Sequence, residues 1–251
     1  MFLVAIVDVE HIPDAARAPL AVALGTTLYE LRLVLSAGLP AVVLTTPEAS
    51  RAEAAVQLIE REAGRAVWGE RRAVYPSARM PAIRDFRFQP SGLTLTETGA
   101  ELLPFSDIFA IIRATHSTVT TSSTVVKERK LDPGMAIITG GLKMSKTTSR
   151  DVVSRTDNRQ QVLYLFRISG APPWLLREQS AHYAGLGNAL GPSSLGNFRE
   201  VVRALRERVP NAAYDERFLA HRALRGISDG IEATDILVHL LALSLGYQPN
   251  C

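Results

Sequence analysis

Two β-branched runs, THSTVTTSSTVVKERK (115–130) and LKMSKTTSRDVVSR (142–155), decide how the second half of this chain folds. Threonine and valine supply eight of the sixteen residues of the first run and four of the fourteen of the second, and β-branched residues favour extended strands. Residues 131–141 lie between the runs and contain Pro133-Gly134, a turn signal. We therefore predict one long β hairpin over residues 115–155. Serine and threonine occupy both faces of its strands, so neither face suits a core and the hairpin should project into solvent.

The predicted hairpin is basic and has an apolar tip. It carries all four lysines of the chain, and residues 127–159 hold eight basic against four acidic residues. That local balance of +4 exceeds the +3 of the whole chain. Exposed apolar tips normally mark a binding surface. The predicted binding residues are Lys127, Arg129, Lys130, Met135, Ile137, Ile138, Lys143 and Lys146.

Three kinds of contact would bury the apolar tip of this hairpin. The tip can pack on the N-terminal module or on a second subunit. It can dock on another protein, with the basic flanks attracting an acidic surface. It can also enter an anionic membrane surface, where each flanking lysine or arginine contributes about 1 kcal/mol. Nucleic acid is not an expected partner, because no aromatic residue lies between 110 and 163 to stack a base.

The first 74 residues have the pattern of a small α+β module. A capping box is expected at Thr27 with Glu30, and Gly64 is expected to end the third helix. The predicted order is strand, helix, helix, strand, helix, strand. The ranges are 2–9, 14–24, 27–37, 40–45, 47–63 and 65–68.

Two short stretches of this module resemble known proteins. ALGTTLYE (23–30) is similar to the turn into the second helix of the bacterial ribosomal stalk protein's C-terminal domain. DVEHIP (8–13) is similar to the corresponding loop of the ClpS adaptor family. The module therefore resembles the fold that these two families share, and the resemblance implies a protein-binding domain.

Beyond residue 83 the hydrophobic period changes to two. Residues 75–83 contain Pro76 and Pro81 and are interpreted as a linker. Alternating apolar residues then predict short antiparallel strands, followed by a helix capped at Ser194. LPFSDI (103–108), before a long strand, is similar to a pattern of bacterial pleckstrin-homology-like domains. This resemblance implies an antiparallel barrel that a terminal helix plugs.

The expected fold class is α+β. It comprises a βααβαβ module (1–74), the linker, a pleckstrin-homology-like antiparallel β-barrel (84–225) and a C-terminal apolar helix and tail (226–251). Residues 231–247 are apolar nearly all round, so this helix must be buried by its own chain or by a second subunit. The predicted oligomer interface consists of Ile236, Leu237, Leu240 and Leu241.

The sequence contains short stretches that look like catalytic motifs, but none lies in the structural context that its chemistry needs. KMSK (143–146) spells the lysine loop of class I aminoacyl-tRNA synthetases but lies in a β-rich region. GLGNALG (185–191) does not open a helix, as a phosphate-binding loop must. The five histidines show no paired metal spacing, and Asp8 with Glu10 could at most form an acid–base pair. We predict no catalytic residue, metal or cofactor.

These patterns together predict a non-enzymatic, self-associating adaptor or scaffold that binds another protein. One alternative is a peripheral membrane protein that uses the basic hairpin. A second is an unrecognised hydrolase that uses Asp8, Glu10 and His11. The start of the sequence lacks a leader pattern and Cys251 is the single cysteine, so the expected location is cytoplasmic, with a membrane-peripheral location as the alternative.

Overall fold

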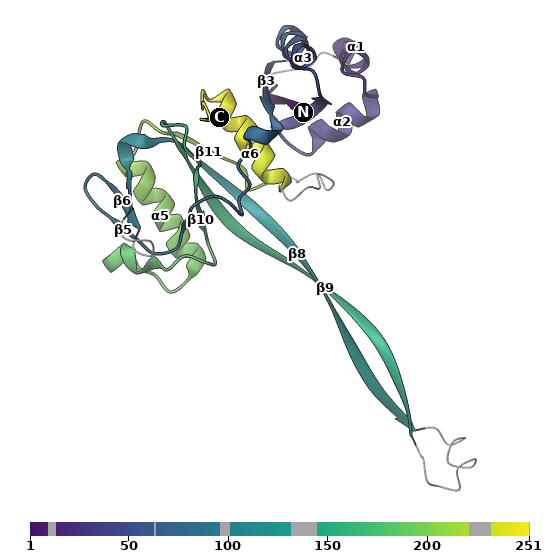
Figure 1. Ribbon diagram of the computed structural model, residues 1–251, viewed down its shortest axis with the longest axis vertical. Coiled ribbons are helices and arrows are strands. Elements are labelled where there is room, and N and C mark those ends of the chain that lie inside the picture. Colours follow the sequence, from purple (N-terminus) through teal and green to yellow (C-terminus); the bar gives the residue numbers. More distant parts are fainter. Residues whose placement is uncertain (10–13, 63, 96–100, 132–144, 221–231, 251) are drawn as a thin grey trace. The chain divides into compact units, whose positions relative to one another are not determined.

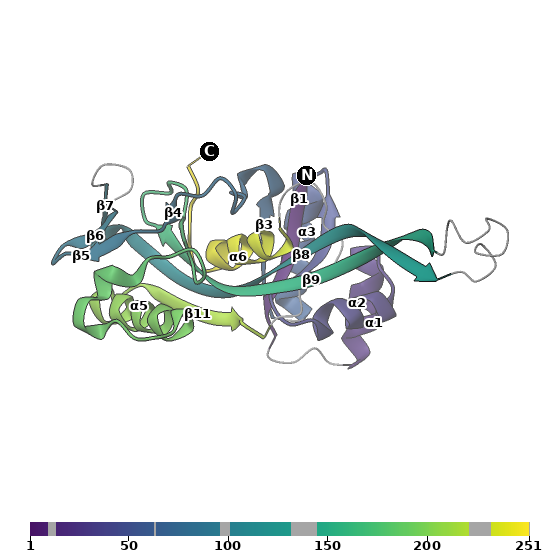
Figure 2. The same ribbon diagram turned by 90° about the horizontal axis from the view of Figure 1, so that it is seen from below.

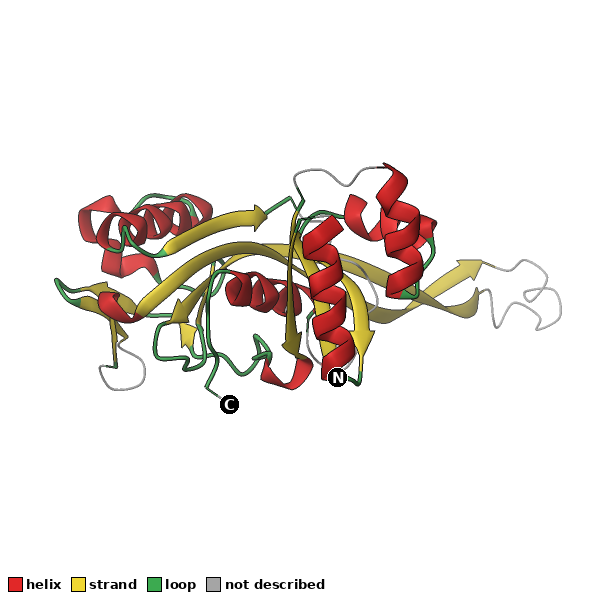
Figure 3. Cartoon of the chain, turned by 90° about the horizontal axis from the view of Figure 1, so that it is seen from above, coloured by secondary structure: helices red, strands yellow, loops and turns green. Residues whose placement is uncertain are grey.

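A computed structural model describes residues 1–9, 14–62, 64–95, 101–131, 145–220 and 232–250, of which 14–15 and 117–158 lack described side chains (Figure 1). The chain is mixed α+β, and helices and strands both contribute throughout (Figure 3). It divides into two compact units. We call Met1–His116 with Gln160–Cys251 the body, and Ser117–Arg159 the outer hairpin.

The body begins with a three-stranded antiparallel sheet in the order β2-β1-β3. Its central strand is buried on both faces, since Val4 and Ile6 pack among the first three helices while Leu3 and Ala5 pack against α6. The elements are β1 (Phe2–Asp8), α1 (Asp14–Leu24), α2 (Leu28–Ser36), β2 (Ala41–Thr46), α3 (Ala49–Glu62), β3 (Arg65–Glu70) and the short 3₁₀ helix η1 (Arg71–Ala73).

Two local signals fix the ends of these helices as the sequence predicts. The Thr27 hydroxyl accepts a hydrogen bond from the Glu30 backbone N–H at 3.1 Å, and Glu30 Oε2 accepts from the Thr27 N–H at 2.9 Å. This is the expected capping box. Gly64 has a φ of +134°, and a Cβ there would lie 2.5 Å from the Asp8 carbonyl oxygen. Only glycine fits this turn without strain.

The rest of the body contains a five-stranded mixed sheet and a separate three-stranded antiparallel sheet. The first has the order β11-β8-β9-β10-β4 and the second the order β5-β6-β7. Their strands are β4 (Ala82–Ile83), β5 (Phe86–Phe88), β6 (Gly92–Leu95), β7 (Leu102–Pro104), β8 (Ile108–Leu131), β9 (Ser145–Arg167), β10 (Trp174–Arg177) and β11 (Ala213–Phe218). The helical elements are the 3₁₀ helices η2 (Phe105–Asp107) and η3 (Tyr183–Ala189), and the helices α5 (Ser194–Arg208) and α6 (Ala233–Ser244).

The closed antiparallel barrel expected for residues 84–225 does not appear, since none of the three sheets of the described residues closes. Both edges of the five-stranded sheet are parallel pairings, β11 with β8 and β4 with β10. A purely antiparallel barrel would instead need its first and last strands to pair with opposite directions. The helix α5 still covers this region through a buried face that includes Phe198, Val201 and Leu205.

The expected linker at 75–83 does not separate two domains. Ser77, Met80 and Ile83 are buried, and β4 at its end belongs to the five-stranded sheet. The physical reason is α6, whose apolar side chains pack against both sheets. Ile236 and Leu240 lie against β1, whereas Leu237 and Leu241 lie with the side chains of β8 and β9. Figure 2 shows α6 beside β3.

The N-cap of α5 is Ser193 and not the expected Ser194. The Ser193 hydroxyl accepts a hydrogen bond from the Gly196 N–H at 3.1 Å. The Ser194 hydroxyl instead donates to Glu178 Oε1 at 3.3 Å. Two consecutive serines are equivalent by composition, so the choice depends on where the helix begins.

The outer hairpin consists of the outer parts of β8 and β9, which are adjacent strands. Their strand assignment confirms the extended conformation expected for residues 115–130 and for most of 142–155. The expected tip falls largely within residues 132–144, outside the described residues.

Candidate functional site

The side chains predicted to bind through the hairpin lie outside the described part of the structure. Four of them have a described strand backbone only, namely Lys127, Arg129, Lys130 and Lys146. The other four fall outside the described residues, namely Met135, Ile137, Ile138 and Lys143. Their binding role stays a prediction.

The oligomer interface predicted on α6 is wrong for this helix. Ile236, Leu237, Leu240 and Leu241 are exposed by only 0%, 4%, 1% and 0% within the single chain. Side chains that their own chain covers to this extent cannot also form a subunit contact. The helix is apolar all round because two layers of the same chain cover it.

The predicted hydrolase pair cannot be assembled from the described residues. Asp8 is exposed at the end of β1, whereas Glu10 and His11 lie outside them. The part of the chain that the structure describes contains no group of three or more histidine, cysteine, aspartate or glutamate residues placed to hold a metal ion.

A buried polar cluster joins the start of α6 to the five-stranded sheet, and we call it the α6 clasp. The Tyr164 hydroxyl donates to Asp235 Oδ1 at 2.6 Å and lies 2.5 Å from His116 Nε2. The Ser77 backbone N–H donates to Asp235 Oδ2 at 2.8 Å. Glu232, which is partly exposed, places Oε2 3.0 Å from His116 Nδ1.

The protonation of the α6 clasp follows from burial and these contacts. Burial raises the pKa of Asp235, although hydrogen bonds from Tyr164 and Ser77 oppose the change. Burial also raises the pKa of Tyr164 well above its usual value, so its hydroxyl stays neutral and donates. The hydrogen bond with His116 lowers the pKa of Glu232. Each of these side chains has a partner inside the cluster, so we interpret the clasp as structural.

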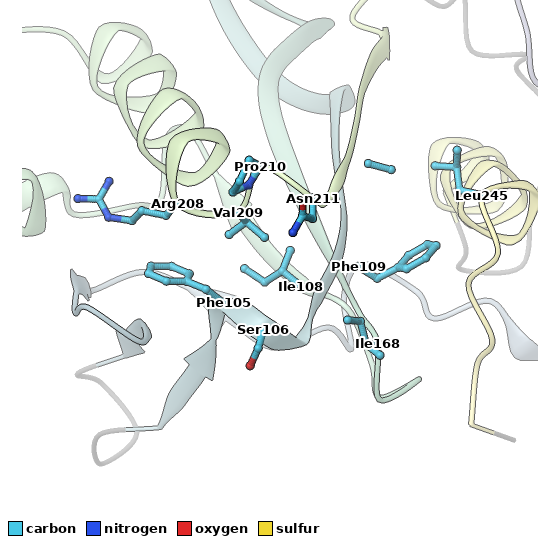
Figure 4. A pocket seen from close by; sticks show the side chains of 11 residues that line it. Phe105, Ser106, Ile108, Phe109, Ile168, Arg208, Val209, Pro210, Asn211 and Leu245 are labelled. Carbon is cyan, nitrogen blue, oxygen red and sulfur yellow. The ribbon is translucent and has the colours of Figure 1, made fainter.

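An apolar cleft lies where the ends of α5 and α6 meet the start of β8. Its volume is about 520 Å³, and the apolar side chains that line it include Phe105, Ile108, Phe109, Val209 and Leu245 (Figure 4). Ile168 stands at the same cleft and is 65% exposed, although Val22 and Leu33 elsewhere in the chain are also exposed. What distinguishes Ile168 is its place at a concave apolar surface, the usual form of a binding site.

A second depression, which we call the arginine groove, lies beside the cleft and shares Val209 and Pro210 with it. Its volume is about 550 Å³. Four arginines and two glutamates line it, which gives a formal charge of +4 − 2 = +2. The charged residues are Arg113, Arg199, Arg203, Arg206, Glu207 and Glu216.

The floor of the arginine groove is held by Arg113. Its guanidinium donates to Gln161 Oε1 from Nε at 3.1 Å and to Glu216 Oε2 from Nη1 at 3.4 Å. Its Cζ also lies 5.7 Å from the centroid of the Phe198 ring. Burial, followed by the hydrogen bond to Glu216, raises the pKa of Tyr214, so this wall of the groove adds no negative charge of its own.

Comparisons with known proteins do not identify these sites. No family model matches the chain, and no curated protein or solved structure shows a significant match. The resemblances to the stalk, ClpS and pleckstrin-homology-like folds therefore stay predictions. Among the described residues no single helix is long and apolar enough to cross a membrane. One pair, Ala16–Leu24 with Leu28–Ser36, passes that test together but is bent by 97°.

Sequence reasoning overlooked both depressions, although one of them has a local signal. Arg199, Arg203 and Arg206 stand at positions i, i+4 and i+7, which places them on one face of a helix. The cleft has no such signal, because its walls come from segments more than 100 residues apart, such as Phe109 and Leu245.

Proposed function

We propose that this chain is a non-enzymatic adaptor that binds another protein, and that a segment of the partner docks in the apolar cleft. The observation that carries the proposal is the open cleft of about 520 Å³ with Ile168 exposed at it. A side chain of the partner that covers Ile168 and enters the cleft would gain burial free energy on binding.

One further observation supports a binding role. The order β1-α1-α2-β2-α3-β3 agrees with our proposal that the first 74 residues share the fold of the stalk and ClpS families. The relatives of that fold bind proteins. The pleckstrin-homology-like kinship of the later residues is proposed on the LPFSDI pattern alone.

The test is a selection of random displayed peptides on the wild-type protein, followed by affinity measurements on two variants. Ile168→Asp changes the cleft, whereas Leu190→Asp changes a side chain that is 51% exposed and does not line it. Burial of a large aliphatic side chain contributes about 1–2 kcal/mol, so Ile168→Asp should weaken the selected peptides roughly tenfold.

Leu190→Asp should leave the affinity unchanged. Selected peptides that bind both variants equally, or a selection that yields no ligand, would contradict the cleft as the docking site.

Self-association is a separate proposal, and it now rests on the hairpin because α6 is covered by its own chain. The four lysines and the apolar residues of the tip would then contact a second copy or the bound partner. Residues 131–141 are the segment whose removal tests this.

A further inference from the structure

We infer that the segment bound by this adaptor is acidic, and that a row of arginines on α5 binds its carboxylates. This inference rests on the proposed function and names the chemistry of the partner. The row consists of Arg199, Arg203 and Arg206, which line the arginine groove together with Arg113.

The three arginines of the row are not equivalent in charge. Arg203 donates to Glu200 Oε1 at 3.0 Å and to Glu207 Oε1 at 2.5 Å, so two carboxylates already compensate it. These contacts raise the pKa of Arg203, the hydrogen bond to Glu200 most of all. The positive charge of Arg203 is therefore already compensated and is not free to pair with a ligand.

Arg199 and Arg206 carry the uncompensated charge. Among the described residues Arg199 makes no hydrogen bond or ion pair. Arg206 has no carboxylate partner there either, and its Cζ lies 4.1 Å from the centroid of the Tyr214 ring. Stacking on an aromatic ring limits the directions in which a guanidinium can point, so less conformational entropy is lost when it pairs with an anion.

The spacing of these two charges favours a peptide over a small anion. Seven residues of helix rise about 10.5 Å, so the attachment points of Arg199 and Arg206 are two turns apart. A single phosphate would meet one of them. Two carboxylates four residues apart on an extended chain lie on the same face about 13 Å apart, within reach of these two long side chains.

The arginine groove and the cleft are adjacent, so one peptide segment can occupy both. Val209 and Pro210 form a wall of both depressions. A chain that places an apolar side chain in the cleft can therefore run over Pro210 into the arginine groove. The segment that fits is one with an apolar residue next to a pair of glutamates or aspartates.

The probe is a fluorescein-labelled extended peptide of about twelve residues, with one phenylalanine followed by two glutamates four residues apart, so that both lie on one face. A second peptide replaces both glutamates with glutamine. Fluorescence anisotropy measures their binding to the wild-type protein and to Arg199→Glu, Arg206→Glu and Arg51→Glu. Arg51 is an exposed arginine of α3 that lines neither depression, so its variant has the same change in net charge.

We expect the glutamate peptide to bind more tightly than the glutamine peptide, and more weakly at high salt. Arg199→Glu and Arg206→Glu should each weaken it about fivefold, while Arg51→Glu should change it by less than about twofold. Circular dichroism confirms that each variant is folded.

Equal affinity for the two peptides, or equal losses in all three variants, would overturn the inference. If the glutamine peptide binds equally well and Ile168→Asp abolishes that binding, the adaptor proposal stands and only the acidic chemistry is wrong. If neither peptide binds, the inference that the bound segment is acidic is also wrong. The displayed-peptide selection then tests separately whether the cleft is a docking site.

Discussion

Replacing His239 by leucine should remove a pH dependence that this histidine confers on folding. His239 lies on α6 and is 3% exposed, and its Nε2 has no hydrogen-bond partner among the described residues. Burial lowers the pKa of His239 from 6.5 to about 4, because the charged imidazolium is poorly solvated there. The ring of Tyr247 lies 6.0 Å away, and burial raises the pKa of Tyr247 to about 12, so it stays neutral throughout.

The sign of this pH dependence follows from the protonation of His239 in the unfolded and in the folded chain. The unfolded histidine takes up a proton near pH 6.5, whereas the folded one resists protonation until about pH 4. The free energy of unfolding is therefore highest above pH 6.5 and falls between pH 6.5 and 4. The gap of about 2.5 pKa units corresponds to about 3 kcal/mol in total, and to about 2 kcal/mol between pH 7 and 5.

Urea denaturation of the wild type and of His239→Leu at pH 7 and pH 5 measures this. Other groups, such as Asp235 and Glu232, titrate in both proteins and cancel in the difference. We expect the wild type to lose about 2 kcal/mol more than the variant between the two pH values. Parallel losses would refute the reasoning, because they would show that His239 ionises freely in the folded chain and that α6 is not buried as described.

Three further predictions concern the α6 clasp, a glycine and the hairpin. Tyr164→Phe should lower the free energy of unfolding by about 1–3 kcal/mol, because it leaves the Asp235 oxygen without its donor; Tyr214→Phe, nearer the surface, should cost less in the same urea titration. Gly64→Ala should lower the melting temperature more than Gly187→Ala, since a Cβ at Gly187 meets no atom within 4 Å; equal shifts would count against the close contact with Asp8. Deletion of 131–141 should reduce the mass measured by light scattering, and an unchanged mass would remove the hairpin from self-association.

The elements of the first 74 residues could be predicted because their signals are local. Thr27 with Glu30 begins a helix and Gly64 ends one, and neither signal depends on the rest of the chain. The apolar character of β1 also predicts its burial, although only the structure shows that α6 covers one of its faces.

The arrangement of the later residues could not be predicted, because it depends on distant pairings. The Ser77 N–H donates to Asp235, 158 residues away, and this hydrogen bond holds part of the expected linker in the core. The parallel pairing of β11 with β8 likewise has no local signature. The same limit applies to the site. Helical spacing could have revealed the arginine row, whereas the cleft exists only once Phe109, Ile168 and Val209 are brought together.

Hydrogen–deuterium exchange of the whole chain, with and without a peptide selected on it, tests the adaptor proposal most directly. Docking in the apolar cleft should slow exchange in residues 105–109 and 208–213, which form its walls, and leave α1 and α2 unchanged. Protection confined to the first 74 residues, or to no part of the body, would contradict binding at this site.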